Sequence, residues 1–209
     1  MINLYRSAIF FCAAIALTAQ HSVANEDDAI VQYSERAVEL LRDAISRETA
    51  HGQGLVPAYA ESLRQVFLEA GFPPDALTIV PYGETASLVV RYEGDGSSGR
   101  KPILFSSHMD VVPADPESWL RHPFELQVDD TFLYGRGVLD NKFDVTILST
   151  LFVWLKESGF APNRDLVIAF TGDEESFQET VQQLARDYRH LVDAEYALVV
   201  DGGGGVLND

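Results

Sequence analysis

Short apolar runs typical of β-strands alternate with longer segments whose apolar residues recur every three to four positions, along most of this 209-residue chain. The helix-like segments span residues 28–48, 57–70, 142–158 and 179–191. The strand-like runs span residues 87–92, 102–106, 124–128, 165–170 and 196–200. This alternation predicts an α/β fold, a three-layer α/β/α sandwich with a largely parallel, mixed central sheet.

The composition limits the kinds of molecule that this chain is expected to bind. Hydrophobic residues make up 46% of the chain, enough to bury a core, and 32 acidic residues outweigh 15 basic ones to give a net charge of -17. Because phosphate groups would be repelled, this balance argues against a nucleic-acid partner or an anionic membrane surface. The acidic residues are therefore expected to keep the chain soluble or to gather around cations.

The N-terminus has the pattern of an export signal. Arg6 supplies a positive charge, Ala8–Ala19 is a short apolar core, and Ser22-Val23-Ala24 is a cleavage site of the small-x-small type. A membrane anchor is the alternative, but it needs about 20 apolar residues and this run is shorter. We expect residues 1–24 to be a signal peptide and the mature chain, residues 25–209, to be periplasmic or secreted, with no membrane attachment.

The mature chain would contain no cysteine, because the single cysteine, Cys12, lies inside the signal. This suits an oxidising compartment and requires no disulfide. It also excludes thiolate metal ligands and a cysteine nucleophile.

Polar residues that can bind metal follow three of the predicted strands. They are His108 and Asp110 after residues 102–106, Asp173, Glu174 and Glu175 after residues 165–170, and Asp201 after residues 196–200. Asp140 lies between a glycine-rich turn and the helix predicted at residues 142–158. In open α/β sheets, ligands bind beyond the carboxyl ends of the strands, so these groups can meet in one crevice. Carboxylates and imidazole are ligands expected of zinc and similar divalent ions.

Each of these residues also has a purely structural interpretation. Asp173–Glu175 could be an acidic helix start, which the helix dipole favours, and His108 could be a hydrogen-bonded residue at a strand end. Asp110 and Asp140 could be turn or cap residues. Gly202–Gly205 lacks the lysine and hydroxyl residue of a phosphate-binding loop and is interpreted as a strand exit.

Five stretches together resemble the ordered motifs of a known enzyme family. They are "SSHMDVVP", a tryptophan followed by "HPF", "YGRGVLDNK", "TGDEES" and "VVDGGG". In this order they are similar to the motifs of the zinc-dependent family of aminoacylases, acetylornithine and succinyl-diaminopimelate deacetylases and glutamate carboxypeptidase. The resemblance runs from about residue 30 to the end of the chain. It implies a zinc-exopeptidase-like α/β domain with a two-zinc site at one end.

The resemblance implies a role for each matching residue. His108 and Asp201 would bind the first zinc ion, and Asp140 would bridge both ions. Glu175 would bind the second ion. Cobalt or manganese would satisfy similar donors.

Two carboxylates would serve catalysis rather than bind metal. Asp110 would orient the His108 imidazole and fix its tautomer. Glu174 would be the general base in hydrolysis of a peptide or N-acyl amino acid amide by metal-activated water. A metal-independent serine hydrolase is disfavoured because the chain has no G-x-S-x-G sequence.

The chain also departs from the family pattern. It ends at Asp209, before the lid and dimerisation domain and before a late histidine ligand of the second zinc, so we expect an N-terminal portion of the catalytic domain that is inactive alone. A homodimer is expected only of a full-length form. Ser176-Phe177-Gln178 stands where small residues and glycine are common. The alternative is a non-catalytic metal-binding or interaction module.

Three histidines of the mature chain, His51, His122 and His190, have no matching ligand context. We expect each of them to be a surface or structural residue.

Overall fold

A computed structural model describes residue 28 and residues 30–201. The chain divides into two compact units, residues 1–38 and residues 39–209. In the first unit, residue 28 and residues 30–38 are helical, and the second unit begins with helical residues 39–45. The signal predicted at residues 1–24 and the strand exit predicted at residues 202–205 lie outside the described residues. Within the described part of the chain, no helix has the length and apolar character needed to cross a membrane.

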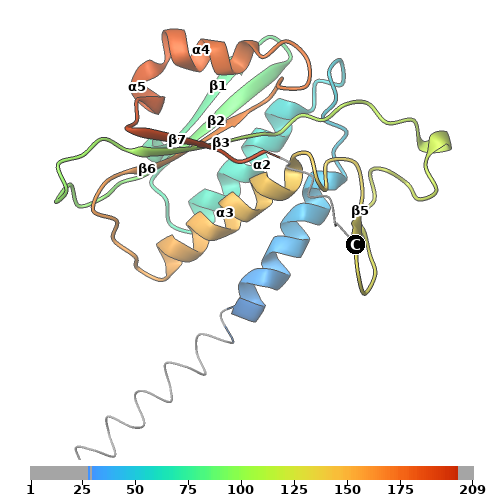
Figure 1. Cartoon of the computed structure of the whole chain (residues 1–209), viewed down its shortest axis with the longest axis horizontal. Helices are drawn as coiled ribbons and strands as arrows, with labels where there is room; N and C mark the ends of the chain where they lie inside the picture. The colour runs from blue at the N-terminus through green and yellow to red at the C-terminus, as the bar shows by residue number, and fades with distance from the viewer. Residues whose placement is uncertain (1–27, 29, 202–209) are drawn as a thin grey trace, which may run out of the picture. The chain divides into compact units, whose positions relative to one another are not determined.

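The second unit is built on a mixed sheet of five strands in the order β1-β2-β6-β3-β7. Their bounds are β1 Leu77–Tyr82, β2 Thr85–Tyr92, β3 Ile103–His108, β6 Leu166–Thr171 and β7 Tyr196–Val199. β3 is parallel to both β6 and β7, whereas β2 is antiparallel to β1 and β6. The predicted α/β fold with parallel strands at its centre is confirmed (Figure 1).

Helices cover both faces of the sheet. α2 (Val56–Glu69) and α3 (Lys142–Glu157) lie on one face, and α4 (Glu179–Asp187) and α5 (Arg189–Val192) lie on the other, as Figure 1 shows. Two short 3₁₀ helices, η1 (Pro74–Ala76) and η2 (Pro116–Ser118), lie in connections. This arrangement gives the three layers that the sequence predicts.

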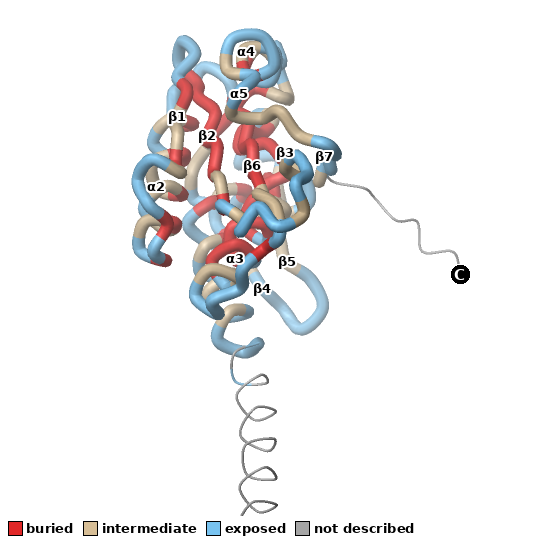
Figure 2. The backbone as a smooth tube through the Cα atoms, turned by 90° about the vertical axis from the view of Figure 1, so that its left-hand side faces the viewer, coloured by how far each residue is buried: buried red, intermediate tan, exposed pale blue. Residues whose placement is uncertain are grey.

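The alternation of side chains along β3 fills a core on each side of the sheet. Phe105 meets Phe152 of α3 edge to face, with ring centroids 5.8 Å apart. Its neighbour Leu104 points to the other face, where it packs into a cluster that includes Leu184 of α4. Figure 2 shows that buried residues run along β2 and β6, two adjacent inner strands of this sheet. Because β3, β6 and β7 are parallel, their carboxyl ends lie at one edge of the sheet.

Two predicted elements differ from those observed, and one observed strand was not predicted. The strand predicted at residues 124–128 is reduced to β4 (Gln127–Val128), which pairs with β5 (Leu133–Tyr134) in a separate hairpin. A backbone hydrogen bond from Glu125 to His122 turns the chain before β4 begins. The helix predicted at residues 179–191 is broken at Tyr188 into α4 and α5, and β1 was not predicted.

Candidate metal centre

His108, the last residue of β3, lies between two aspartates. Its Nε2 atom is 2.9 Å from Asp140 Oδ1 and 3.5 Å from Asp201 Oδ1. One ligand atom from each of the three residues lies within 4.8 Å of the others. The His108 side chain is only 2% exposed, while both aspartates face solvent. Three predicted ligands thus meet, although they are far apart in the sequence.

The sheet brings two of these residues together. In the parallel pairing of β3 with β7, Ser106 is opposite Val199, and the N–H of Val200 donates to the carbonyl of Ser106 at 2.8 Å. Both strands end at this point, so His108 and Asp201 leave the sheet side by side. This is the crevice at the carboxyl ends of parallel strands where ligands bind in open α/β sheets.

The third residue, Asp140, is carried by the turn before α3. Gly137 has a φ of +89°, and a Cβ there would lie 2.9 Å from a methyl group of Val111, so the tight turn requires glycine. The N–H of Lys142 donates to the carbonyl of Gly137 at 2.8 Å. The peptide bond that joins Asp140 to Asn141 is cis. The glycine-rich sequence before Asp140 therefore shapes the turn that presents this carboxylate.

Lys142 fastens the same turn to the body of the domain. Its side chain is fully buried, and its Nζ donates to the carbonyl of Ala44 at 2.8 Å and to that of Arg47. Burial lowers the pKa of this lysine to about 7. The buried amine thus satisfies carbonyl groups at, and just after, the end of the helical residues 39–45.

Asn141 links the turn to the end of β7. Its buried side-chain amide donates to the carbonyl of Val200 at 3.0 Å and to Asp201 Oδ1 at 3.1 Å. Asp140 and Asp201 are thus held as neighbours through one asparagine. Nothing in the sequence indicates a contact between residues 141 and 201, so Asn141 is not among the predicted site residues.

Asp110 lies behind the histidine and contacts the loop that follows β6. Its Oδ1 is 3.3 Å from His108 Nδ1, and its backbone carbonyl is 3.0 Å from the same nitrogen. Its two carboxylate oxygens accept the backbone N–H groups of Glu174 and Glu175, each at 3.0 Å. Asp110 is therefore in position to orient the imidazole and the two glutamates together.

The paired glutamates differ in their surroundings. The Glu174 carboxylate accepts a hydrogen bond from Gln178 Nε2 at 3.1 Å. Glu175 is outside the group of three ligand atoms around His108. Burial raises the pKa of Glu175, and so does the negative charge of Asp140. The carboxylates of Glu175 and Asp140 therefore repel each other.

Asp173 has the helix-start role that was one interpretation of the acidic run. It accepts the N–H of Glu179 at 2.8 Å and that of Thr180 at 3.0 Å, which satisfies two donors of the first turn of α4. The Thr180 hydroxyl also donates to it. Asp173 therefore fixes the loop from the α4 side.

The negative charges around His108 indicate what the site can hold. Burial lowers the pKa of His108, but its hydrogen bond to Asp110 and the charges of Asp110, Asp201 and Asp140 raise this pKa to about 9. The negative charge of these carboxylates around one imidazole makes binding of a positive charge favourable. An imidazole nitrogen with two carboxylates is also a donor set suited to a divalent cation, so these residues fit a metal ion.

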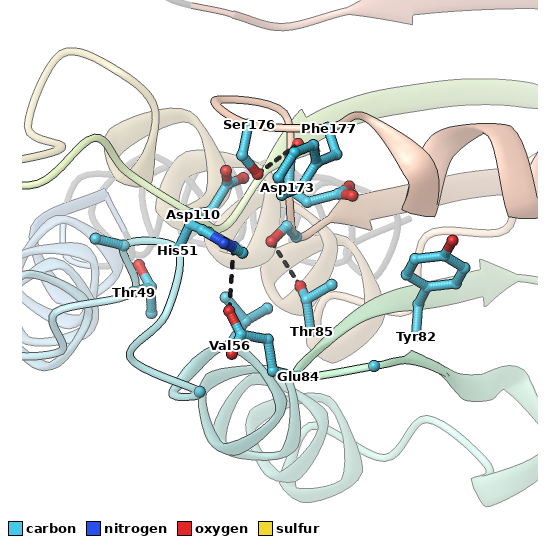
Figure 3. Close-up of a pocket in the computed structure, with 14 residues that line it drawn as sticks. Thr49, His51, Val56, Tyr82, Glu84, Thr85, Asp110, Asp173, Ser176 and Phe177 are labelled. Atoms are coloured by element: carbon cyan, nitrogen blue, oxygen red, sulfur yellow. Dashed lines mark hydrogen bonds and ion pairs between the residues drawn. The ribbon is translucent and has the colours of Figure 1, made fainter.

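A pocket of about 170 Å³ lies beside Asp110 and is lined mainly by apolar atoms. His51 lies at its wall, with Nδ1 3.1 Å from Glu84 Oε1 and its ring edge-on to Phe177 (Figure 3). His51 is thus engaged away from the three metal-binding candidates. The other two unmatched histidines, His122 and His190, are also outside that group. The Nδ1 atom of His122 accepts the N–H of Phe124.

Residues 104–208, just over half of the chain, match the family described as Peptidase family M20/M25/M40. The chain belongs to this family. The resemblance found in the motifs is thereby confirmed. The M20 family is metal-dependent, and His108, Asp140 and Asp201 could hold a metal ion.

Several M20 relatives share part of the sequence. The chain is 40% identical over 90 residues to a probable carboxypeptidase S-like protein from Dictyostelium discoideum, covering 43% of this chain and 17% of that protein. It is 37% identical over 100 residues to acetylornithine deacetylase of the same organism, covering 46% and 22%. It is 30% identical over 175 residues to a probable succinyl-diaminopimelate desuccinylase from Staphylococcus aureus, covering 82% and 40%. The chain thus spans less than half the length of each of these relatives.

Solved structures confirm the M20-type fold. The di-peptidase Dug1p of Saccharomyces cerevisiae superposes with a TM-score of 0.66 at 21% identity, over 83% of this chain and 40% of that chain. An M20 family metallo-carboxypeptidase from Sulfolobus solfataricus gives a TM-score of 0.65 at 18% identity, over 81% and 38%.

Proposed function

We propose that this protein is part of a metal-dependent hydrolase that cleaves the amide bond of a peptide or an N-acyl amino acid. The observation that carries the proposal is the position of His108, whose Nε2 faces Asp140 and Asp201 while its Nδ1 faces Asp110. The names of M20 relatives support the substrate class, since they include an acetylornithine deacetylase and a human N-fatty-acyl-amino acid synthase/hydrolase.

Zinc is the proposed metal, with cobalt or manganese as possible substitutes. His108 and Asp201 would hold one ion, and Asp140 would be shared with a second ion bound by Glu175. When bound, zinc would polarise the amide carbonyl and lower the pKa of a water molecule. The second ion has fewer candidate ligands among the described residues, so we expect it to bind more weakly.

The chain's own carboxylates would position and move protons. Glu174 would accept a proton from the attacking water at a carboxylate oxygen and pass it to the leaving nitrogen. Asp110 would keep the proton of His108 on Nδ1 and leave Nε2 free for the metal. Because Asp110 also holds the N–H of Glu174, the base and the metal ligand would keep a fixed relation.

We further propose that residues 25–209 are the N-terminal portion of a catalytic domain and that residues 1–24 direct export to the periplasm or medium. The partial coverage of the relatives supports the first statement. The resemblance of the motifs implies that later segments add a histidine ligand and substrate contacts. The chain alone would then be inactive, and dimerisation would belong to the full-length form.

Calorimetry and activity assays test this function. Residues 25–209 are titrated with zinc and then assayed on a panel of N-acyl amino acids and dipeptides, beside a version extended through a lid domain. We expect one zinc site of higher affinity in the short chain and chelator-sensitive turnover in the extended one. Zinc binding without turnover in both would favour the non-catalytic module, and strong turnover by the short chain would contradict its proposed inactivity.

Mass spectrometry tests export. The full chain is expressed in a bacterium with a general secretion pathway, and the N-terminus of the product is measured. Processing to Asn25 in the periplasm is expected. An unprocessed cytoplasmic product would contradict the proposed signal peptide.

A further inference from the structure

Gln178 has an unusual backbone conformation at the start of α4. Its φ is +55°, the left-handed region, and no other non-glycine residue in the described part of the chain has a positive φ. Side chains with a Cβ atom rarely adopt this conformation, which glycine enters freely. A glutamine in this left-handed conformation therefore suggests that its side chain has a functional role.

The side chain of Gln178 turns back onto Glu174. Its Nε2 donates to Glu174 Oε1 at 3.1 Å and lies 3.3 Å from the backbone carbonyl of Glu174. Among residues 28 and 30–201, no other side chain donates a hydrogen bond to the Glu174 carboxylate. The amide of Gln178 is thus the contact that restricts this carboxylate.

The loop between Glu174 and Gln178 is held by other contacts. The carbonyl of Asp173 accepts the N–H groups of Ser176 at 3.2 Å and Gln178 at 2.9 Å. On the opposite side, Asp110 accepts the N–H of Glu174 at 3.0 Å. Because backbone and capping contacts already define the loop, the Gln178 amide is not needed to shape it.

We propose that Gln178 is a positioning residue that holds the Glu174 carboxylate through its side-chain amide. This rests on the proposed function, in which Glu174 is the general base. A glutamate side chain has several rotatable bonds, so an unheld carboxylate would spend much of its time away from the reacting water. Catalysis is sensitive to displacements of about 1 Å, so a single charge-assisted hydrogen bond can matter.

Side-chain NMR on the full, zinc-free chain tests the contact itself. In Gln178→Gly, the order of the Glu174 side chain is expected to fall while backbone order of the loop is kept, because glycine suits the positive φ. In Glu174→Gln, the side-chain amide resonances of Gln178 are expected to shift. Gln182→Ala, which removes an exposed amide one turn later on α4, should change neither signal.

Unchanged Glu174 order in Gln178→Gly, or unchanged Gln178 resonances in Glu174→Gln, would overturn the proposal. Neither result requires turnover, so failure of this proposal is distinct from failure of the proposed function. Gln178→Asn is a second variant, since asparagine tolerates the left-handed conformation but is one methylene shorter. It should resemble Gln178→Gly.

Kinetics give a second measurement in any form of the protein that turns over. Loss of a hydrogen bond to a charged group predicts that Gln178→Gly lowers kcat about tenfold with little change in KM or zinc content. In a Glu174→Gln background the same change should have no further effect. An equal loss in both backgrounds would mean that Gln178 acts elsewhere and would contradict the proposal.

Discussion

Asp110 and Glu174 are joined by a hydrogen bond of 3.0 Å from the backbone N–H of the glutamate to Oδ1 of the aspartate. The same oxygen lies 3.3 Å from His108 Nδ1, and the other carboxylate oxygen accepts the N–H of Glu175. One buried carboxylate thus connects a proposed metal ligand to the loop that carries the proposed base. Changes at Asp110 should therefore affect metal binding and loop geometry together.

Replacement of Asp110 by asparagine should weaken zinc binding about 10- to 100-fold, the usual cost of losing the partner that orients a ligand. An amide has one oxygen, so one N–H of the glutamate loop also loses its acceptor, and the melting temperature should fall. Zinc calorimetry and thermal unfolding measure both effects. Asp115→Asn is the control, because Asp115 caps the exposed helix η2. Equal behaviour of the two variants would rule out the role of Asp110.

Replacement of His108 by alanine should abolish the zinc site of higher affinity, because His108 contributes the only nitrogen of the three-residue group. Metal content after dialysis against zinc measures the loss. His51→Ala is the matched control, since His51 contacts Glu84 and Phe177 instead. If both variants retained zinc, the ion would be bound elsewhere.

Substitutions at the two adjacent glutamates should distinguish metal binding from catalysis. Glu174→Gln preserves the shape of the side chain but removes the proton acceptor, so an active form should lose turnover and keep its metal. Glu175→Gln should also lose metal, specifically at the weaker site. Metal analysis and kcat on the same samples test this. A similar loss of metal in both variants would show that the two roles are wrongly assigned.

Zinc binding should strengthen with increasing pH. In the metal-free fold the pKa of His108 is raised from 6.5 to about 9, so the folded chain keeps a proton that the unfolded chain releases. This proton stabilises the metal-free fold fully below the unfolded value, and that contribution is lost as pH rises through about 9. Zinc must displace the proton, so affinity should rise about tenfold per pH unit between these values.

Calorimetry in buffers of different ionisation enthalpy checks this directly. We expect release of about one proton per zinc ion at about pH 7, with a smaller number near the pKa of the histidine. His108→Ala should release none at the residual sites. Zinc affinity that stays constant with pH would contradict a protonated His108.

The elements that follow from local pattern were predicted closely. α3 spans Lys142–Glu157, within one residue of the helix expected from its apolar period and Gly159. β1 was overlooked because Pro81 weakens its strand pattern, but β1 is an edge strand, where proline is tolerated. Local patterns thus identify buried helices better than short edge strands.

The candidate ligands were predicted, but the contacts that hold them were not. His108 and Asp201 could be placed together because both follow parallel strands. The hydrogen bond from the Asn141 amide to Asp201 depends on how separate segments pack, and the one from the Gln178 amide to Glu174 depends on the left-handed backbone of Gln178. Neither residue type nor spacing indicates such pairings, so only the three-dimensional structure reveals them.

The position of β7 gives the proposed metal a mechanical consequence. Among residues 30–201, β7 pairs with β3 alone, and its residues Tyr196, Leu198 and Val199 are at least half exposed. A cation bound by Asp201, just after β7, and by His108, at the end of β3, would link the two strands. Amide hydrogens of β7 should then exchange with solvent more slowly once zinc is added. The proposed catalytic ion would thus also stabilise the edge of the sheet.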